Sequence, residues 1–126
     1  MIGYVTLGTS DIARAARFYD AIAKELDTPR MMGSEDQGMI AWATPGGAPG
    51  IEVLSPFDGK APTVGNGSMV ALRAADKAQV RRLHKIALEQ GGSCEGEPGP
   101  RQNGVFYAAY FRDPDGHKLN AFVMGA

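Results

Sequence analysis

Residues 107–122, YAAYFRDPDGHKLNAF, place two apolar, aromatic-rich runs on either side of a short turn. The turn consists of Asp113, Pro114, Asp115 and Gly116. Proline presets φ for a turn, aspartate can bond the backbone downstream of it, and glycine accepts the positive φ at which strands bulge to close. The stretch therefore predicts a β-hairpin near the end of the sequence.

Length and composition limit the class of protein. The 126 residues are 44% hydrophobic and 21% charged, which fits one globular domain with a core of its own. The net charge of -1 and the lack of any basic run disfavour a nucleic acid or an anionic membrane as partner, because phosphate polymers are bound by clustered positive charge. The single cysteine cannot form an internal disulfide, and no apolar stretch approaches the roughly 20 residues of a membrane span. We therefore expect a cytoplasmic protein.

The first half predicts one strand, one helix and three further short strands. Residues 2–8 alternate and are rich in β-forming side chains, and residues 10–26 carry apolar side chains at helical spacing. Ser10 is the expected N-cap of this helix, and Pro29 ends it. Glycine and proline then separate the segments RMMGS, MIAWAT and IEVLS, with the turn-rich PGGAPG between the last two.

An internal repeat relates the two halves. A polar connector rich in proline and glycine divides a single domain into module 1 at about residues 1–56, a linker at about 57–66 and module 2 at about 67–126. A shift of 65 residues carries the first strand and helix onto the second, which places another helix near residues 76–90. The matching pairs are Val5 with Val70, Leu7 with Leu72, Asp11 with Asp76, Ala13 with Ala78, Arg17 with Arg82 and Phe18 with Leu83.

The last two strands of each half repeat at a shift of 68, since IAWATPGGAPGIEV matches AAYFRDPDGHKLNA. Trp42 then corresponds to Tyr110, and Glu52 corresponds to Asn120. Each half contains one strand, one helix and three strands, and about 60 residues bury too little apolar surface to be stable alone. We therefore expect an α+β fold in which two βαβββ modules share a core.

The repeated module, the helix sequence SDIARAARFYD and the hairpin FRDPDGHKLNAF together resemble the vicinal oxygen chelate (VOC) superfamily. That superfamily includes glyoxalase I, extradiol dioxygenases, fosfomycin-resistance proteins and bleomycin-binding proteins. The resemblance implies that each module curves its mixed sheet into half of a cup, with the helices outside and a ligand cavity inside. It also implies a homodimer, because relatives often build the cup across a two-fold axis and a partner would cover exposed sheet edges.

Catalytic members of the superfamily hold one divalent metal ion through His or Gln, Glu, His and Glu on four strands. By position, the resemblance carries these ligands onto Tyr4, Glu52, Met69 and Asn120. A phenol, a thioether and a carboxamide are poor replacements for imidazole and carboxylate around a divalent ion. We therefore expect no metal ligands and no cofactor, with a weakly bound divalent metal as the alternative.

The resemblance also implies a small-molecule pocket. In fosfomycin-resistance relatives a tyrosine at the place of Tyr110 faces the cavity, and the repeat would carry Trp42 to the matching face. The alternative is that both are core aromatics, since an error of one residue in hairpin register turns each to the other side. The predicted substrate-binding residues are Tyr4, Thr6, Trp42, Met69, Tyr110, Asn120 and Phe122, with Glu52 as the candidate catalytic residue.

Two classes of function are compatible with this pocket. The missing metal ligands favour metal-independent binding or sequestration of a small molecule. The alternative is a lyase or isomerase that uses Glu52 as general base, or a dioxygenase-like enzyme in which Glu52 belongs to a weak divalent-metal site.

Two further residues with reactive side chains have plain structural interpretations. His84 lies in the second predicted helix, at the repeat position of Tyr19, and is expected to be a helix-packing residue rather than a metal ligand. Cys94 follows that helix with no partner nearby in sequence, so it is expected to be a spectator thiol. A nucleophilic role for Cys94 would require a base beside it.

Overall fold

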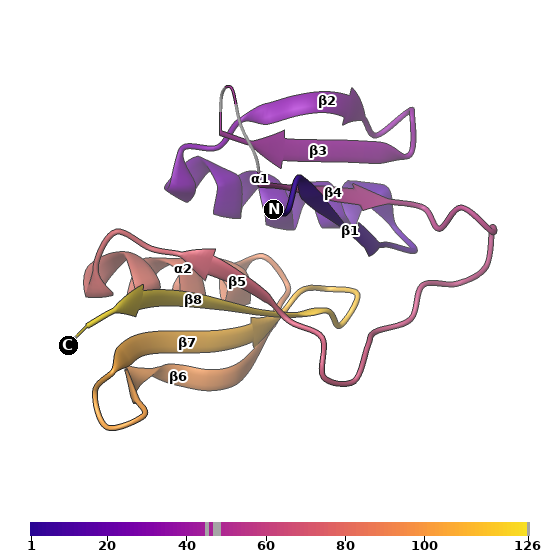
Figure 1. Cartoon of the computed structure of the whole chain (residues 1–126). Coiled ribbons are helices and arrows are strands. Elements are labelled where there is room, and N and C mark those ends of the chain that lie inside the picture. The colour runs from indigo at the N-terminus through magenta and orange to yellow at the C-terminus, as the bar shows by residue number, and fades with distance from the viewer. Residues whose placement is uncertain (45, 47–48, 126) are drawn as a thin grey trace. The chain divides into compact units, whose positions relative to one another are not determined.

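The computed structural model describes residues 1–44, 46 and 49–125, which form two compact units, Met1–Thr63 and Val64–Ala126 (Figure 1). From here on we call these two units module 1 and module 2. Part of the predicted turn at residues 45–50 lies outside the described residues. Module 1 contains β1 (Tyr4–Gly8), α1 (Ile12–Leu26), β2 (Arg30–Ser34), β3 (Met39–Ala43) and β4 (Gly50–Leu54). Module 2 contains β5 (Val70–Arg73), α2 (Lys77–Glu89), β6 (Ser93–Arg101), β7 (Phe106–Arg112) and β8 (Lys118–Met124). The predicted α+β fold of two βαβββ modules is confirmed.

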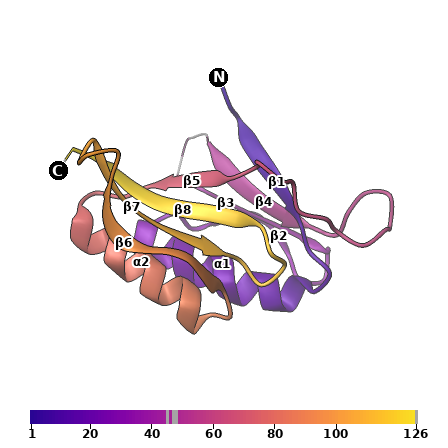
Figure 2. The same cartoon turned by 90° about the horizontal axis from the view of Figure 1, so that it is seen from below.

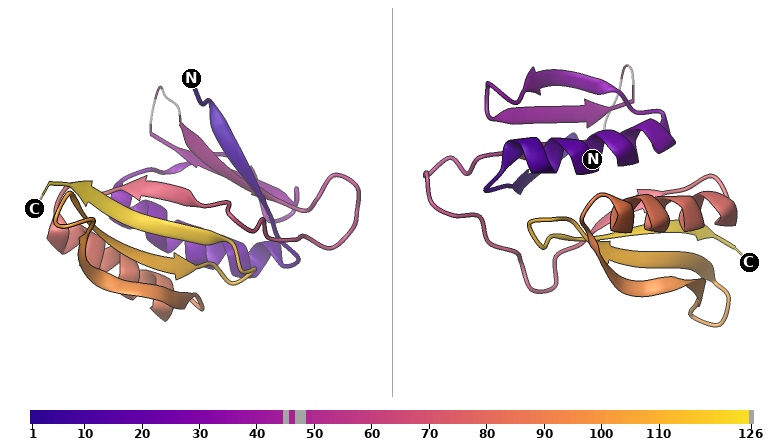
Figure 3. Two further views of the ribbon diagram at one scale, coloured as in Figure 1. Left: turned by 60° about the horizontal axis from the view of Figure 1, so that its bottom comes forward. Right: turned by 180° about the vertical axis from the view of Figure 1, so that it is seen from behind.

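Each module has one mixed, four-stranded sheet. The strand orders are β1-β4-β3-β2 and β5-β8-β7-β6. The first strand pairs in parallel with the last, and the other neighbours are antiparallel. Within each module the helix lies across one face of the curved sheet, as Figures 2 and 3 show for α2 against β6, β7 and β8. We call the sheet face turned away from the module's own helix the far face.

Both helices begin at an aspartate. The Asp11 carboxylate accepts a hydrogen bond from the Arg14 backbone N–H at 3.1 Å, and the Asp76 carboxylate accepts one from the Gln79 N–H at 2.8 Å. The N-cap of α1 is therefore Asp11, and the prediction of Ser10 was wrong by one residue. Asp11 is the residue with extended backbone just before the first helical turn, where a short acceptor side chain reaches the unpaired N–H groups.

The cores have the expected alternation. On the helix side of module 1, Ile40 and Val53 are at most 1% exposed, and on that of module 2 Phe111 and Leu119 are fully buried. Val53 pairs with Ile40, and Leu119 pairs with Phe111, so each pair presents one apolar layer to its helix. Neither α1 nor α2, the two helices within the described residues, is long and apolar enough to cross a membrane.

The predicted hairpin forms between β7 and β8, and its turn is organised by Asp113. The Asp113 carboxylate is buried and accepts hydrogen bonds from the backbone N–H groups of Asp115 and His117, both at 2.9 Å. Gly116 has φ of 96°, a value that glycine adopts without a steric penalty. One side chain thus satisfies two backbone donors and fixes where β8 begins.

Asp113→Ala should lower the free energy of unfolding by about 2 kcal/mol, because two backbone N–H groups lose their acceptor inside the turn. Asp113→Asn keeps an acceptor oxygen and should cost less than half as much. Urea denaturation of both variants beside the wild-type protein measures this difference. Equal losses for the two variants would show that charge, rather than the two hydrogen bonds, accounts for the role of Asp113.

Candidate functional site

The far face of module 2 brings together three of the predicted pocket residues. Tyr110 pairs with Asn120 across β7 and β8, and Phe122 lies two residues further along β8. The intervening residue Ala121 is fully buried on the helix side. Strand alternation therefore places Tyr110, Asn120 and Phe122 on one face of the sheet.

Two cations lie over the ring of Tyr110. The Arg101 guanidinium carbon and the Lys118 Nζ are each 5.4 Å from the ring centroid. Arg101 donates two hydrogen bonds to backbone carbonyls, those of Glu97 at 2.7 Å and Pro100 at 3.2 Å, which hold it beside the sheet. A guanidinium has five N–H donors, so others stay available for a ligand. The ring of Tyr110 therefore lies beside two positive charges.

Asn120 has an unsatisfied polar atom. Its side chain is 4% exposed, and its Oδ1 accepts no hydrogen bond within the described part of the chain. A buried carbonyl oxygen without a donor costs about 1–3 kcal/mol. A ligand group with an N–H or O–H would remove that cost.

The far face of module 1 carries Tyr4, Thr6 and Glu52. Glu52 pairs with Thr6 of β1 and with Ala41 of β3, and Tyr4 lies two residues from Thr6 on the same side of β1. Tyr4 is 64% exposed, and Glu52 is half-buried.

The four positions of the family's metal ligands do not fit a divalent ion. Glu52 is the one carboxylate among them. Met69 lies just before β5 and is 42% exposed, Asn120 offers a neutral oxygen and Tyr4 a phenol. Zinc, manganese and magnesium need imidazole or several charged oxygens, so this donor set provides neither the charge nor the ligand types.

Trp42 does not lie on the far face, which corrects the prediction that it faces the pocket with Tyr110. It is 5% exposed, its ring packs 5.6 Å from that of Tyr19 in α1, and it pairs with Ile51 rather than with Glu52. The paired residues Ala41 and Glu52 are 11 positions apart, whereas Tyr110 and Asn120 are 10 apart. The first hairpin is one residue longer, so the structural counterpart of Trp42 is Phe111, and Tyr110 corresponds to Ala41.

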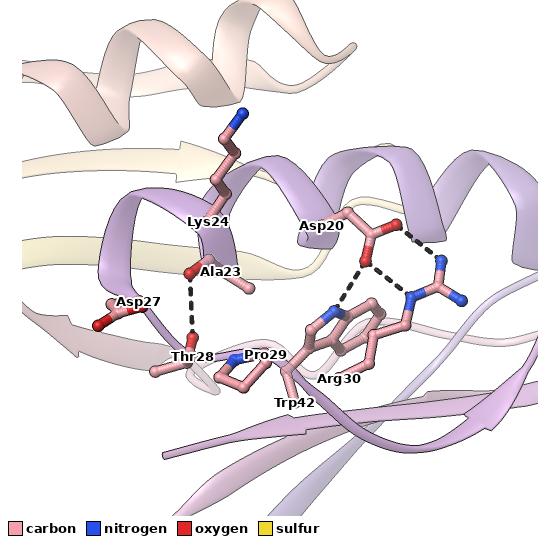
Figure 4. A pocket seen from close by; sticks show the side chains of 8 residues that line it. All are labelled: Asp20, Ala23, Lys24, Asp27, Thr28, Pro29, Arg30 and Trp42. Atoms are coloured by element: carbon pink, nitrogen blue, oxygen red, sulfur yellow. Dashed lines mark hydrogen bonds and ion pairs between the residues drawn. The ribbon is translucent and has the colours of Figure 1, made fainter. Parts of the chain in front are cut away.

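Trp42 instead belongs to a hydrogen-bonded group on module 1, which Figure 4 shows. The Asp20 carboxylate accepts hydrogen bonds from Trp42 Nε1 at 2.9 Å and from Arg30 Nε and Nη2 at 2.9 and 2.7 Å. Arg30 also donates to Glu35 at 2.8 Å. Asp20, Arg30 and Trp42 border a pocket of about 260 Å³ beside the end of α1. The hydrogen bonds from Arg30 of β2 and Trp42 of β3 to Asp20 of α1 therefore hold both strands against the helix.

The hydrogen bonds from Arg30 hold the pKa of the Asp20 carboxyl below its usual range. Burial opposes this shift, and the hydrogen bond from Trp42 adds a smaller lowering contribution. The same guanidinium lowers the pKa of the Glu35 carboxyl. Asp20 in turn raises the pKa of Arg30, with Glu35 as the next contribution. All three groups are therefore charged throughout the neutral pH range.

His84 and Cys94, which the sequence analysis treated separately, lie in contact on the helix side of module 2. His84 Nε2 lies 3.3 Å from Cys94 Sγ, and the Cys94 thiol lies 3.6 Å from Glu97 Oε1. Cys94 therefore has a partner, contrary to the expectation of a spectator thiol. His84 is also a packing residue of its helix, as expected, with its ring 6.5 Å from that of Phe111.

Comparison with known proteins identifies the family. Residues 1–121 match the family model described as the Glyoxalase/Bleomycin resistance protein/Dioxygenase superfamily. The chain belongs to this superfamily, which the hairpin and the repeat had indicated. No curated protein matches the chain.

Solved structures of the superfamily resemble the chain over nearly its full length. A glyoxalase/bleomycin resistance protein from Albidiferax ferrireducens T118 is 31% identical, with a TM-score of 0.85 and 97% of each chain covered. A putative glyoxalase from Bacillus halodurans is 19% identical, with a TM-score of 0.77 and coverage of 97% of this chain and 94% of that one. A glyoxalase-related enzyme from Fulvimarina pelagi is 20% identical, with a TM-score of 0.75 and coverage of 97% and 86%. The last two likenesses show the fold alone.

Asp20→Asn should destabilise the protein by about 1 kcal/mol at neutral pH. This is less than the loss expected for a buried ion pair, because Asp20 is partly exposed and solvent screens its charge. Since the folded-state pKa of Asp20 is lowered, its stabilising effect is present above the unfolded pKa of about 4 and is lost as the pH falls through the folded-state pKa. The difference between wild type and variant should therefore shrink below about pH 4.

The matched control for this experiment is Asp27→Asn, which removes a carboxylate bordering the same pocket but leaves Arg30 untouched. Asp27 adopts φ of 56°, a conformation that asparagine also tolerates. Urea unfolding at several pH values compares the two variants with the wild type. A pH-independent loss for Asp20→Asn would contradict the assignment of its effect to the ion pair with Arg30.

Proposed function

We propose that the protein binds a small anionic molecule at the far face of module 2 and that this binding needs no metal ion. The observation that carries the proposal is the combination of Tyr110, under two cations, with the buried and unsatisfied Oδ1 of Asn120. Binding or sequestration, rather than metal-dependent lyase or dioxygenase chemistry, is the function that this arrangement supports best.

The charges favour an anionic ligand. Arg101 and Lys118 come from different strands and approach one aromatic ring, so their fields add over the same surface. A guanidinium fork matches a carboxylate or phosphonate, and the ring of Tyr110 gives an aromatic ligand a surface to stack on. A ligand with both a carboxylate and a hydrogen-bond donor would use the cations and Asn120 Oδ1 together.

The donor chemistry supports the absence of a catalytic metal. The positions that hold metal in catalytic members of the superfamily offer a phenol, one carboxylate, a thioether and a carboxamide in this chain. Glu52 is the single charged group among them, and burying a divalent ion beside one carboxylate leaves its charge uncompensated. The proposal therefore assigns ligand recognition to side chains alone.

The proposal includes a homodimer. The edges of the two sheets are β1 and β2 in module 1, and β5 and β6 in module 2. Tyr4 on β1 and Met31 and Met32 on β2 are 50% or more exposed, which leaves apolar side chains along two of these edges. A second copy of the chain is the partner that would cover such edges, as in many members of this superfamily.

For the ligand site, we expect 4-hydroxybenzoate to bind more tightly than uncharged 4-hydroxybenzamide and more tightly than benzoate, which lacks the hydroxyl donor. Arg101→Gln should weaken 4-hydroxybenzoate binding by about tenfold and reduce its dependence on salt, because one cation of the site is lost. Isothermal titration calorimetry measures the affinities, and ligand-induced shifts in melting temperature provide an independent readout.

The chain offers a matched control in Arg81→Gln. Arg81 lies 6.0 Å from the ring of Tyr107, a neighbouring tyrosine on β7, so the substitution removes a similar contact on the helix side. Arg81→Gln and prior dialysis against EDTA should both leave the affinity for 4-hydroxybenzoate unchanged. Equal effects of the two arginine substitutions, or loss of binding after EDTA, would contradict the proposal.

For the assembly, sedimentation equilibrium should give twice the chain mass of 13.3 kDa, because a two-fold partner covers the exposed edges. Raising the salt concentration should not dissociate the dimer, since the exposed edge side chains are apolar. A sedimenting species of 13.3 kDa at all concentrations tested would contradict the dimer.

A further inference from the structure

Three potential metal ligands converge on the helix side of module 2, away from the far face. His84 comes from α2 and is 5% exposed, while Cys94 and Glu97 lie on β6 and are accessible to solvent. The ligand atoms of these residues all lie within 4.8 Å of one another. In the part of the chain that the structure describes, no side-chain cation is bonded to the Glu97 carboxylate.

Irregular pairing of β6 makes this convergence possible. Cys94 pairs with Phe111, a residue of the helix side, so its sulfur points towards His84. In a regular strand, Glu97 would lie on the opposite face, because side chains alternate and the two residues are three apart. The β6–β7 register shifts twice, once between Cys94 and Gly96 and again between Gly96 and Gly99. Bulges of this kind redirect side chains, and here the Glu97 carboxylate reaches the sulfur.

The two separations that involve the Cys94 sulfur fit a tetrahedral ion. A zinc ion with Zn–S of about 2.3 Å and Zn–N of about 2.0 Å holds its sulfur and nitrogen ligands about 3.5 Å apart. The separation of His84 Nε2 from Cys94 Sγ is 3.3 Å, and that of Cys94 Sγ from Glu97 Oε1 is 3.6 Å. Small side-chain adjustments at the exposed Cys94 and Glu97 would admit the ion.

The arrangement fits a metal site better than a nucleophilic triad. In a triad the carboxylate orients the histidine, whereas Glu97 contacts the sulfur. A carboxylate beside a thiol opposes the negative charge that a nucleophilic thiolate requires. A divalent cation reverses this effect, because it compensates both the thiolate and the carboxylate at once.

We propose that His84, Cys94 and Glu97 bind one thiophilic divalent cation of the zinc type. Binding replaces the S–H bond of Cys94 by a sulfur–metal bond, and the proton leaves to solvent. Three protein ligands leave the fourth tetrahedral position for water or a small exogenous ligand. Magnesium and calcium are excluded as occupants, since a thiolate and an imidazole are poor ligands for them. The site is separate from the far face of module 2, so it stands whether or not the ligand proposal holds.

Cobalt(II) titration of tag-free, reduced protein tests the site, because thiolate-bound cobalt gives a charge-transfer absorption in the near ultraviolet. We expect one cobalt ion per chain and displacement of the band by zinc. Cys94→Ser should abolish the band. Glu97→Gln should weaken cobalt binding by at least about tenfold, because loss of a residue that only supports a metal ligand already costs about that much. Both substituted side chains are exposed, so folding should be preserved.

Glu89→Gln is the control, since Glu89 is an exposed carboxylate on the same helix and lies outside the cluster. It should bind cobalt as the wild type does. The buried His84 is best followed without mutation, by two-dimensional NMR of the two imidazole side chains. Zinc should shift the resonances of His84 and leave those of His117 unchanged. Absence of the charge-transfer band in the wild type, a band that survives Cys94→Ser, or unchanged His84 resonances would overturn the proposal.

Discussion

Hairpin register is the constraint on which both the core and the candidate site depend. Side chains along a strand alternate with a period of two, so a shift by one residue exchanges the helix side for the far face. In module 2 the buried carboxylate of Asp113 fixes the register by holding two backbone N–H groups at the start of β8. That register sends Phe111 and Leu119 into the core and leaves Tyr110 and Asn120 on the far face.

The order of the elements could be predicted because it depends on local patterns. Helical spacing, the turn-forming glycines and prolines and the 65-residue repeat are all visible in the sequence. The helices and strands in the described part of the chain follow them. The orientation of Trp42 could not be predicted, because the sequence match used one constant shift across a hairpin whose two copies differ in length by a residue. The ring of Tyr19 contacts that of Trp42, and the ring of His84 contacts that of Phe111. Because Tyr19 and His84 are repeat positions, these contacts show that Trp42 corresponds to Phe111.

The contact of Cys94 with His84 was missed for a different reason. It depends on how β6 is placed against α2 and on two irregularities in the β6–β7 ladder. The sequence offers a partial signal in GGSCEGEPGPR, since glycines and prolines within a strand often mark bulges. Such a signal predicts that the strand is irregular without saying which side chains the irregularity brings together.

The edge strands β2 and β6 occupy corresponding positions in the two modules, and different side chains connect each of them to its helix. Arg30 of β2 pairs with Trp42, and Cys94 of β6 pairs with Phe111, so Arg30 and Cys94 occupy corresponding places. In module 1 the positive charge at this place is the Arg30 guanidinium, bound by two carboxylates.

In module 2 the corresponding place holds the Cys94 thiol beside the His84 imidazole and the Glu97 carboxylate. These groups can bind a cation, but they carry no positive charge equivalent to that of Arg30. A metal ion bound there would supply the positive charge that Arg30 supplies in module 1. It would join β6 to α2 as the ion pair joins β2 to α1, so metal binding at this place would stabilise module 2 as well as occupy its surface.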